Sequence, residues 1–327
     1  MRISTRITGL LGVEHPILLA PMDVVADGKL AATVSKAGGF GIIGGGYGNE
    51  EWLRRELDAA GDARVGVGFI TWSMTKNPRL LDLALERKPP AIMLSFGDVK
   101  PHAEKIKRVG ALMICQVQTV AQAKEAVANG ADVLVAQGAE GGGHGIARGT
   151  FALVPAVVDA ARGVPVVAAG GVADGRGLAA ALMLGADGVL VGTRFYATLE
   201  AMGPQGAKER IVSASGDGTI RSILFDIARR NVWPAPYTGR VLRNEFSERW
   251  RGREAELMQH QADEAARYDK ARETGDFDTA AVIAGEGVDM ISDIPPAREV
   301  VDRMVKEAAA LLAGSNRYRV EQQPTAP

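Results

Sequence analysis

Residues 133–145 read VLVAQGAEGGGHG, an apolar run followed by a glycine-rich loop that carries one histidine, His144. An unbroken apolar run is typical of a strand buried on both faces. The glycines let a backbone or a ligand approach closely, and an imidazole gains or loses a proton near neutral pH. A solvent-facing loop histidine would read the same way, but functional side chains concentrate on loops over rigid scaffolds. The stretch therefore predicts a strand whose end leaves room for a flat ligand beside His144.

Seven similar apolar runs occur elsewhere in the chain, with starts spaced by roughly 20 to 30 residues, the size of a strand-helix unit. The eight runs lie at 15–20, 40–43, 65–71, 91–96, 112–117, 133–137, 164–169 and 188–191. Helical patterns separate them, for example at 49–60, which follows a plausible N-cap at Asn49. Eight strands alternating with helices predict an α/β fold, a closed (β/α)8 TIM barrel. The rival is an open doubly wound sheet, which the strand count disfavours.

The alternation stops after residue 200. Residues 201–290 are rich in Arg and Glu, and 247–272 shows no strand pattern. We therefore expect a helical cap inserted after strand eight, over the active site. Pro295-Pro296 then opens an amphipathic helix at 297–313, with Val300, Val301, Met304, Ala308 and Leu311 on one face. The predicted barrel comprises residues 1–200 and 291–315, the cap 201–290, and a polar tail 316–327.

The composition is that of an ordinary globular protein, with 327 residues, 46% hydrophobic residues and a net charge of −1. That charge gives no global field for nucleic acid or an anionic membrane, and we expect neither as a partner. Cys115, the only cysteine, lies in an apolar run and reads as a buried structural thiol. We predict no metal site. The start of the chain lacks a signal-peptide pattern and no run is long enough to span a bilayer, so we expect a cytoplasmic protein.

Two residue pairs that contain glycine predict an anion site. Gly170-Gly171 ends the seventh predicted strand, and Gly192-Thr193 ends the eighth. In TIM barrels the loops after these strands commonly bind phosphate, through backbone N–H groups and helix N-termini. The glycines would also fit simple turns, but two pairs at the two expected strand ends favour phosphate. Asp174 is placed to cap the helix that follows the first pair.

Residues 39–44 match the dinucleotide pattern G-x-G-x-x-G literally. That fingerprint must follow a strand and open a helix. Here it lies within a predicted strand, and the next helix begins only near Asn49. We interpret these glycines instead as space for a ligand ring at the mouth of the barrel.

Taken together, these stretches resemble the nitronate monooxygenase family, formerly called 2-nitropropane dioxygenases. They are similarly close to the FMN-dependent enoyl-ACP reductase of fatty-acid synthesis. The matching segments cover the predicted barrel, about residues 3 to 200, and are 15–22, 37–41, 137–144, 168–177 and 184–195. The resemblance is looser in the cap.

The resemblance implies a TIM barrel that holds FMN at the carboxyl ends of its strands, with His144 as the catalytic histidine. Carried over by position, the cofactor-binding residues are Met22, Gly68, Gln116, Gln137, Gly142, Gly171, Gly192 and Thr193. Met22 would meet the flavin through its backbone, and the last three would hold its phosphate. Two positions depart from the family pattern: Gly68 stands where many members have Asn, and Gln116 where some have Lys or an apolar residue.

Three functions follow as hypotheses. The first is oxidation of alkyl nitronates by O2 to a carbonyl compound and nitrite. The second is an NAD(P)H-dependent reductase acting on quinones or enoyl thioesters, which the glycine run 44–46 favours. The third, suggested by Gly68, is a flavin-binding or structural barrel without activity. We expect a small-molecule substrate in the first two cases. The sequence leaves the oligomeric state open, with a homodimer as one option.

Overall fold

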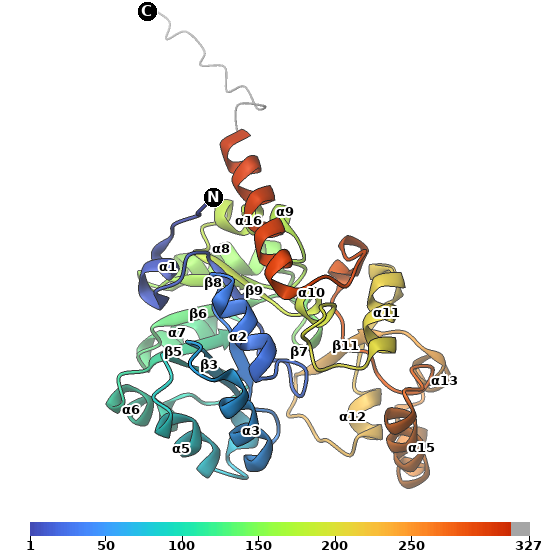
Figure 1. Ribbon diagram of the computed structural model, residues 1–327. Coiled ribbons are helices and arrows are strands. Elements are labelled where there is room, and N and C mark those ends of the chain that lie inside the picture. The colour runs from blue at the N-terminus through green and yellow to red at the C-terminus, as the bar shows by residue number, and fades with distance from the viewer. Residues whose placement is uncertain (315–327) are drawn as a thin grey trace, which may run out of the picture.

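The computed structural model describes residues 1–314 and shows a strand barrel with a second lobe beside it (Figure 1). Eight parallel strands form one sheet in the order β1-β9-β8-β6-β5-β4-β3-β2. A further parallel bridge between Leu18 and Phe40 joins its two end strands, so the sheet closes on itself. The predicted closed (β/α)8 barrel is therefore confirmed, and the alternative of an open sheet is not. The strands are β1 Ile17–Leu19, β2 Ile42–Gly44, β3 Gly66–Ile70, β4 Ala91–Ser95, β5 Leu112–Val117, β6 Val133–Gln137, β8 Val166–Ala169 and β9 Gly188–Val191.

One helix, α1, precedes the first strand, and the helices that follow the strands surround the barrel. They are α1 Arg6–Leu11, α2 Gly28–Lys36, α3 Glu50–Ala60, α4 Thr71–Met74, α5 Arg79–Glu86, α6 Lys100–Arg108, α7 Val120–Ala128, α8 Thr150–Ala160, α9 Gly175–Met183 and α10 Thr193–Tyr196. Both predicted N-caps are confirmed. The Asn49 side chain accepts from the Trp52 N–H at 2.9 Å, and Asp174 accepts from the Arg176 N–H at 2.9 Å. Each satisfies an N–H that the helix itself leaves unpaired.

The inside of the barrel is packed with side chains. Strand residues such as Phe40, Met93 and Val135 form one buried cluster, and Ile7 and Leu11 of α1 join it. A larger cluster fills the space between strands and helices. Cys115 belongs to it, 1% exposed, and burial raises the pKa of its thiol to about 12, as expected for a structural cysteine.

The glycines at 39–44 have a different role from the one expected. A Cβ on Gly41 would lie 1.9 Å from the Ala31 carbonyl oxygen, and one on Gly44 would lie 2.5 Å from that of Met22. These glycines let the backbone of α2 and of the loop after β1 approach β2. Our interpretation that they make space for a ligand ring was wrong, because neighbouring backbone occupies that space.

The cap, residues 201–290, contains strands as well as helices. Its elements are α11 Gln205–Ser213, η1 Gly216–Gly218, β10 Thr219–Ser222, α12 Leu224–Ala228, β11 Thr238–Leu242, α13 Glu245–Trp250, α14 Glu254–Gln259, α15 Gln261–Thr274 and η2 Glu286–Met290. A purely helical cap was thus an incomplete prediction. Strands β10 and β11 form an antiparallel sheet with β7, Gly143–Gly145, in which Gly239 pairs with His144. The cap is therefore hydrogen-bonded to the loop that carries His144.

The last described helix, α16 Ala297–Ala313, has the predicted bounds and packs against α9 and α2 (Figure 1). Val300, Val301, Met304 and Ala308 are buried, whereas Leu311, expected on the same face, is 38% exposed. Residue 315 and the predicted tail 316–327 lie outside the described residues. Within residues 1–314, no helix combines the length and the apolar character needed to cross a bilayer.

Candidate active site

A cavity of about 790 Å³ lies at the carboxyl ends of the barrel strands, where the cap meets the barrel. This volume is within the range of cofactor and substrate sites. The barrel contributes Pro21 and Met22 after β1 and Phe96 after β4, and the cap contributes Arg229 and Trp233. Carboxyl strand ends are where TIM barrels carry their active sites.

The structure brings six of the nine predicted site residues to this cavity. They are Met22, Gly68, Gln116, Gln137, Gly142 and His144. The other three, Gly171, Gly192 and Thr193, do not line it. A Cβ on Gly192 would nevertheless lie 3.6 Å from the sulfur of Met22, so this loop adjoins the cavity wall.

Two of the predicted phosphate residues, Gly171 and Thr193, lie together with Gly142 against one segment of the cap, residues 284–287. The Gly285 N–H donates to the Thr193 hydroxyl at 3.0 Å. A Cβ on Gly142 would lie 2.7 Å from the backbone of Ala284, and one on Gly287 would lie 3.1 Å from the Gly171 carbonyl oxygen. Sequence reasoning missed this segment, although Gly285 and Gly287 repeat the spaced-glycine signal of the predicted phosphate loops.

Backbone N–H groups at these loops have no protein partner. Within residues 1–314, the N–H groups of Gly142, Gly171 and Gly192 meet no hydrogen-bond acceptor. Nearby, the Glu140 carboxylate accepts from the Thr150 N–H at 2.8 Å and caps α8. Unpaired backbone donors on glycine loops are suited to an anion.

The Gly171 and Gly192 positions differ in backbone conformation. Gly171 has φ +73°, which side chains rarely adopt. Gly192 has φ −107°, and an added Cβ would make only ordinary contacts, 3.5 Å from the Ala20 Cβ. The fold therefore requires glycine at 171, whereas at 192 glycine serves only to leave space.

Gly68 has a packing explanation. A Cβ there would lie 2.4 Å from the Pro21 Cβ, so the proline that follows β1 occupies the place of a side chain. Pro21 and Gly68 both line the cavity. Close packing against the Pro21 side chain thus accounts for glycine at position 68.

Two glutamines, Gln116 and Gln137, line the cavity, and a third, Gln118, lies behind them. The Gln137 Oε1 accepts from Nε2 of Gln116 at 2.9 Å and from Nε2 of Gln118 at 2.8 Å. These two bonds fix the orientation of the Gln137 amide. Its NH2 group therefore remains available to a ligand carbonyl or ring nitrogen. Gln118, 2% exposed, was not predicted from the sequence.

His144 is held by the cap. Its Nε2 lies 3.1 Å and 3.0 Å from the two carboxylate oxygens of Asp226, on α12. The indole of Trp233 stacks on the imidazole, with ring centroids 3.4 Å apart and planes 7° apart. The Trp233 Nε1–H donates to the Tyr47 hydroxyl at 3.1 Å, which ties the stack to the barrel. The imidazole thus has one fixed nitrogen and one covered face.

Burial is the largest influence on this histidine, and it lowers the pKa of His144 below its ordinary value. The Asp226 carboxylate opposes that effect, while the guanidinium groups of Arg229 and Arg221 add to it. The neutral imidazole, able to accept a proton, is therefore the form present at neutral pH.

Arg221 on β10 fixes the loop before His144. Its guanidinium donates to the carbonyl oxygens of Ala139 at 2.8 Å and Gly141 at 3.1 Å. Burial lowers the pKa of Arg221 to about 10, which still leaves it charged at neutral pH. A charged group bonded to two carbonyls holds the glycine loop in one conformation.

Arg229 faces the cavity without a protein partner. Among the described residues, its guanidinium makes neither a hydrogen bond nor an ion pair within 4.0 Å. It lies over the Tyr47 ring, 5.8 Å from the ring centroid. Asp23, also in the cavity wall, influences it electrostatically but does not pair with it. A half-buried guanidinium with its donors open to a cavity is suited to an anionic ligand.

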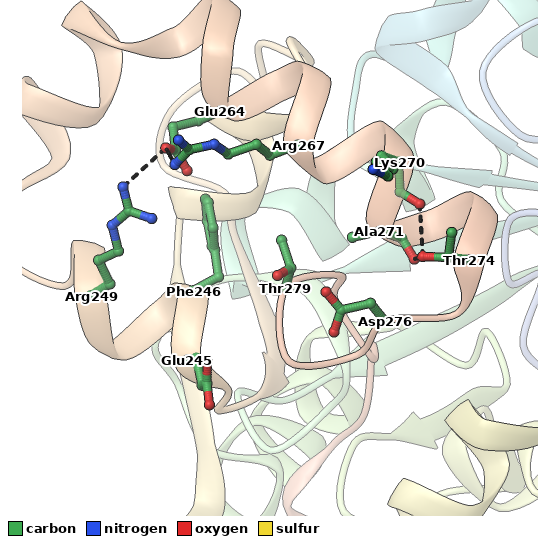
Figure 2. Close-up of a pocket in the computed structure, with 10 residues that line it drawn as sticks. All are labelled: Glu245, Phe246, Arg249, Glu264, Arg267, Lys270, Ala271, Thr274, Asp276 and Thr279. Carbon is green, nitrogen blue, oxygen red and sulfur yellow. Dashed lines mark hydrogen bonds and ion pairs between the residues drawn. The ribbon is translucent and has the colours of Figure 1, made fainter.

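A second, smaller pocket of about 340 Å³ lies within the cap (Figure 2). Three of its charged side chains pair with one another: Glu264 pairs with Arg249 at 3.1 Å and with Arg267 at 2.8 Å. The Trp250 Nε1–H also lies 3.3 Å from Glu264, which is 3% exposed. This cluster satisfies its own charges and stabilises the cap.

The sequence is similar to those of known nitronate monooxygenases. The family model described as nitronate monooxygenase matches residues 4–66 and 66–307. A nitronate monooxygenase of Neurospora crassa is 34% identical and aligns over 90% of this chain and 89% of its own.

Solved structures show the same fold. FabK from Thermotoga maritima superposes with a TM-score of 0.86 at 32% identity, covering 97% of this chain and all of that one. A nitroalkane oxidase from Streptomyces ansochromogenes gives a TM-score of 0.80 at 25% identity, covering 94% and 99%. The resemblance found in the motifs is confirmed: the chain belongs to the nitronate monooxygenase family.

Proposed function

We propose that this protein is an FMN-dependent enzyme that oxidises alkyl nitronates with O2 to a carbonyl compound and nitrite. The observation that carries the proposal is the pair of groups at one cavity: neutral His144 and the unpartnered cation Arg229. A nitronate is an anion formed by loss of a proton next to a nitro group. A base and a cation on one cavity suit that chemistry. The residue roles and the division into barrel and cap belong to the same proposal.

The cavity wall fits a flavin. Pro21 and Gly68 pack closely in the wall, and the Gln137 amide offers a polar group held by two hydrogen bonds. The unpaired N–H groups of Gly142, Gly171 and Gly192 are donors suited to a phosphate. FMN would thus lie with its ring toward Met22 and Gln116 and its phosphate toward Thr193. When bound, the flavin supplies the electron transfer and reactivity with oxygen that side chains lack.

His144 supplies proton chemistry. If the substrate arrives as a neutral nitroalkane, the imidazole accepts the α-proton. If it arrives as the nitronate, no α-proton has to be removed, and binding of the anion depends on Arg229. Burial beneath Trp233 keeps water from the imidazole face. A fixed, desolvated base is effective because little reorganisation precedes proton transfer.

Arg229 supplies positive charge. A charge-assisted bond to an anionic substrate contributes about 1.5–3 kcal/mol when well shielded. The half-exposed position of Arg229 reduces that gain by solvent screening. The same charge lowers the pKa of His144, which favours its basic form before substrate binds.

The NAD(P)H-dependent reductase remains the second hypothesis, but the feature that suggested it is accounted for by packing. In the glycine run 44–46, a Cβ on Gly45 would lie 2.6 Å from the Phe69 ring, and one on Gly46 would lie 2.4 Å from an Asp23 oxygen. These contacts require glycine whatever the reaction. The glycine run therefore no longer supports the reductase hypothesis.

The test combines two assays of the FMN-loaded protein. Oxygen uptake and nitrite release are measured with ethyl nitronate, 2-propyl nitronate and propionate-3-nitronate. Bleaching of the flavin by NADH and NADPH is measured without oxygen. We expect nitronate-dependent oxygen uptake and slow or absent bleaching. Rapid bleaching without turnover of any nitronate would reject the proposal in favour of a reductase. A protein unable to take up FMN would reject both.

A further inference from the structure

We propose that Asp226 is a positioning residue that keeps the His144 proton on Nε2, so that Nδ1 is the nitrogen that exchanges a proton with the substrate. This inference rests on the proposed role of His144 as a base. Its structural part, the tautomer, can be measured without any turnover.

The geometry leaves one hydrogen-bond arrangement. Both Asp226 oxygens lie within 3.1 Å of Nε2, and both side chains are only 9% exposed. A carboxylate can only accept, so Nε2 must donate. A neutral imidazole has one N–H, which leaves a lone pair on Nδ1. Among the described residues Nδ1 has no hydrogen-bond partner, while His144 lines the cavity.

Two further residues of the cap, Gly239 and Trp233, hold the imidazole beside Asp226. Gly239 on β11 pairs with His144, and a Cβ at Gly239 would lie 3.5 Å from Nε2. At that distance a side chain would make an ordinary contact, so β11 lies directly beside the edge of the imidazole that Asp226 approaches. Trp233 covers one face of the ring and opposes its rotation. The sheet, the carboxylate and the indole fix the position, the tautomer and the plane of the imidazole.

The charges around His144 explain why a carboxylate is needed. The side chains that act on it are Asp226 of α12, Arg229 just after α12 and Arg221 of β10. Burial and both guanidinium groups disfavour the imidazolium, and only Asp226 favours it. When Nδ1 takes a proton, Asp226 stabilises the resulting positive charge. Without Asp226, His144 would be a much weaker base.

The principal test is nitrogen NMR of the FMN-loaded protein with ¹⁵N-labelled histidine. The chain has four histidines, and His144→Gln identifies the signals of His144. We expect Nε2 to carry the proton and Nδ1 to show the shift of an unprotonated nitrogen. In Asp226→Asn the amide can donate to Nε2, so the tautomer should reverse or become mixed. Asp226→Glu, which keeps a carboxylate, should restore the Nε2–H form at least in part.

Kinetics provide the second readout. Asp226→Asn should reduce proton abstraction from a neutral nitroalkane by about 10²-fold, the lower end of a general base's contribution. Oxidation of a preformed nitronate should change less. The midpoint at which activity rises with pH should also move to lower pH. Without the Asp226 carboxylate, burial and the two arginines lower the pKa of His144 unopposed. Asp278→Asn, which removes an exposed ion pair with Arg210 elsewhere in the cap, is the matched control and should change neither readout.

The outcomes separate the two proposals. A proton on Nδ1 in the wild-type protein overturns the positioning role, even if Asp226→Asn fails to fold. An unchanged tautomer and pH profile in folded Asp226→Asn overturns it as well. An Nε2–H tautomer that depends on Asp226, in a protein that oxidises no nitronate, supports the positioning role and rejects the proposed function.

Discussion

The barrel and the cap contribute to the candidate site in different ways. The barrel's part is mostly backbone and close packing: glycine loops with unpaired N–H groups, and Gly68 against Pro21. The cap's part is side chains: Asp226, Arg229 and Trp233 surround His144. His144 itself belongs to the barrel by sequence but forms sheet with the cap. The difference suggests that the barrel binds the cofactor and the cap determines what happens to the substrate.

The largest effect is expected at the junction of the two regions. His144→Ala should reduce turnover of a neutral nitroalkane by about 10²- to 10⁴-fold, because the general base is lost. The protein should remain yellow, since His144 contributes no bond to the flavin phosphate in this account. Steady-state oxygen uptake and the flavin absorbance of the same sample measure both. Loss of the flavin in this variant would place His144 in the cofactor site instead.

The next effect tests the barrel alone. Gly192→Val should fold, because a Cβ at that position makes ordinary contacts and φ is −107°. It should weaken FMN binding by about ten- to a hundredfold through loss of a charge-assisted bond and of space beside the phosphate. Titration of the apoprotein with FMN gives the dissociation constant. Gly9→Val, where no heavy atom lies within 4 Å of an added Cβ, is the control. Unchanged FMN affinity in folded Gly192→Val would refute the phosphate site.

A smaller effect tests the cap. Arg229→Met should raise KM for a nitronate by about tenfold, less than a fully buried charge pair would give. FMN affinity should not change. Arg230→Met is the matched control: the neighbouring Arg230 is exposed and pairs with Asp269 at 2.6 Å, an exposed pair of little energetic value. Equal KM changes in the two variants would show that Arg229 does not contact the substrate.

The smallest effect concerns pH. Because burial lowers the pKa of His144, activity on a neutral nitroalkane should rise with pH through a midpoint below 6.5, its ordinary value. Arg229→Met removes a nearby positive charge, so the pKa should rise and the midpoint should move toward 6.5. The pH dependence of kcat/KM for the two proteins measures the shift. A midpoint above 6.5 in the wild-type protein would contradict the expectation that burial lowers the pKa of His144.

The same division explains what the sequence could predict. The barrel strands are continuous apolar runs at a regular interval, because each is buried on both faces. The strands of the cap are short, and β10 and β11 each carry an arginine whose side chain bonds to loop carbonyls. Polar and apolar residues therefore do not alternate clearly along these strands, and the prediction of a purely helical cap missed them.

Contacts between distant residues were also beyond the sequence. Asp226 is 82 residues from His144, and an aspartate in a short helix has no distinguishing pattern. Arg229 is one of many arginines in the cap, and only the structure shows that it faces the cavity. In contrast, the family resemblance implied Met22, Gln137 and Gly142, and all three line the cavity at the ends of strands that periodicity predicts.

The most direct test of this division is the flavin-to-protein absorbance ratio of two variants purified side by side: Gly192→Val in the barrel, and the double variant Asp226→Asn/Arg229→Met in the cap. The account predicts a low ratio for the first. It predicts a ratio close to that of the wild type for the second, despite its impaired nitronate oxidation. A cap variant that lost its flavin as completely as Gly192→Val, while remaining folded, would contradict the claim that the barrel loops, and not Asp226 or Arg229, hold the cofactor.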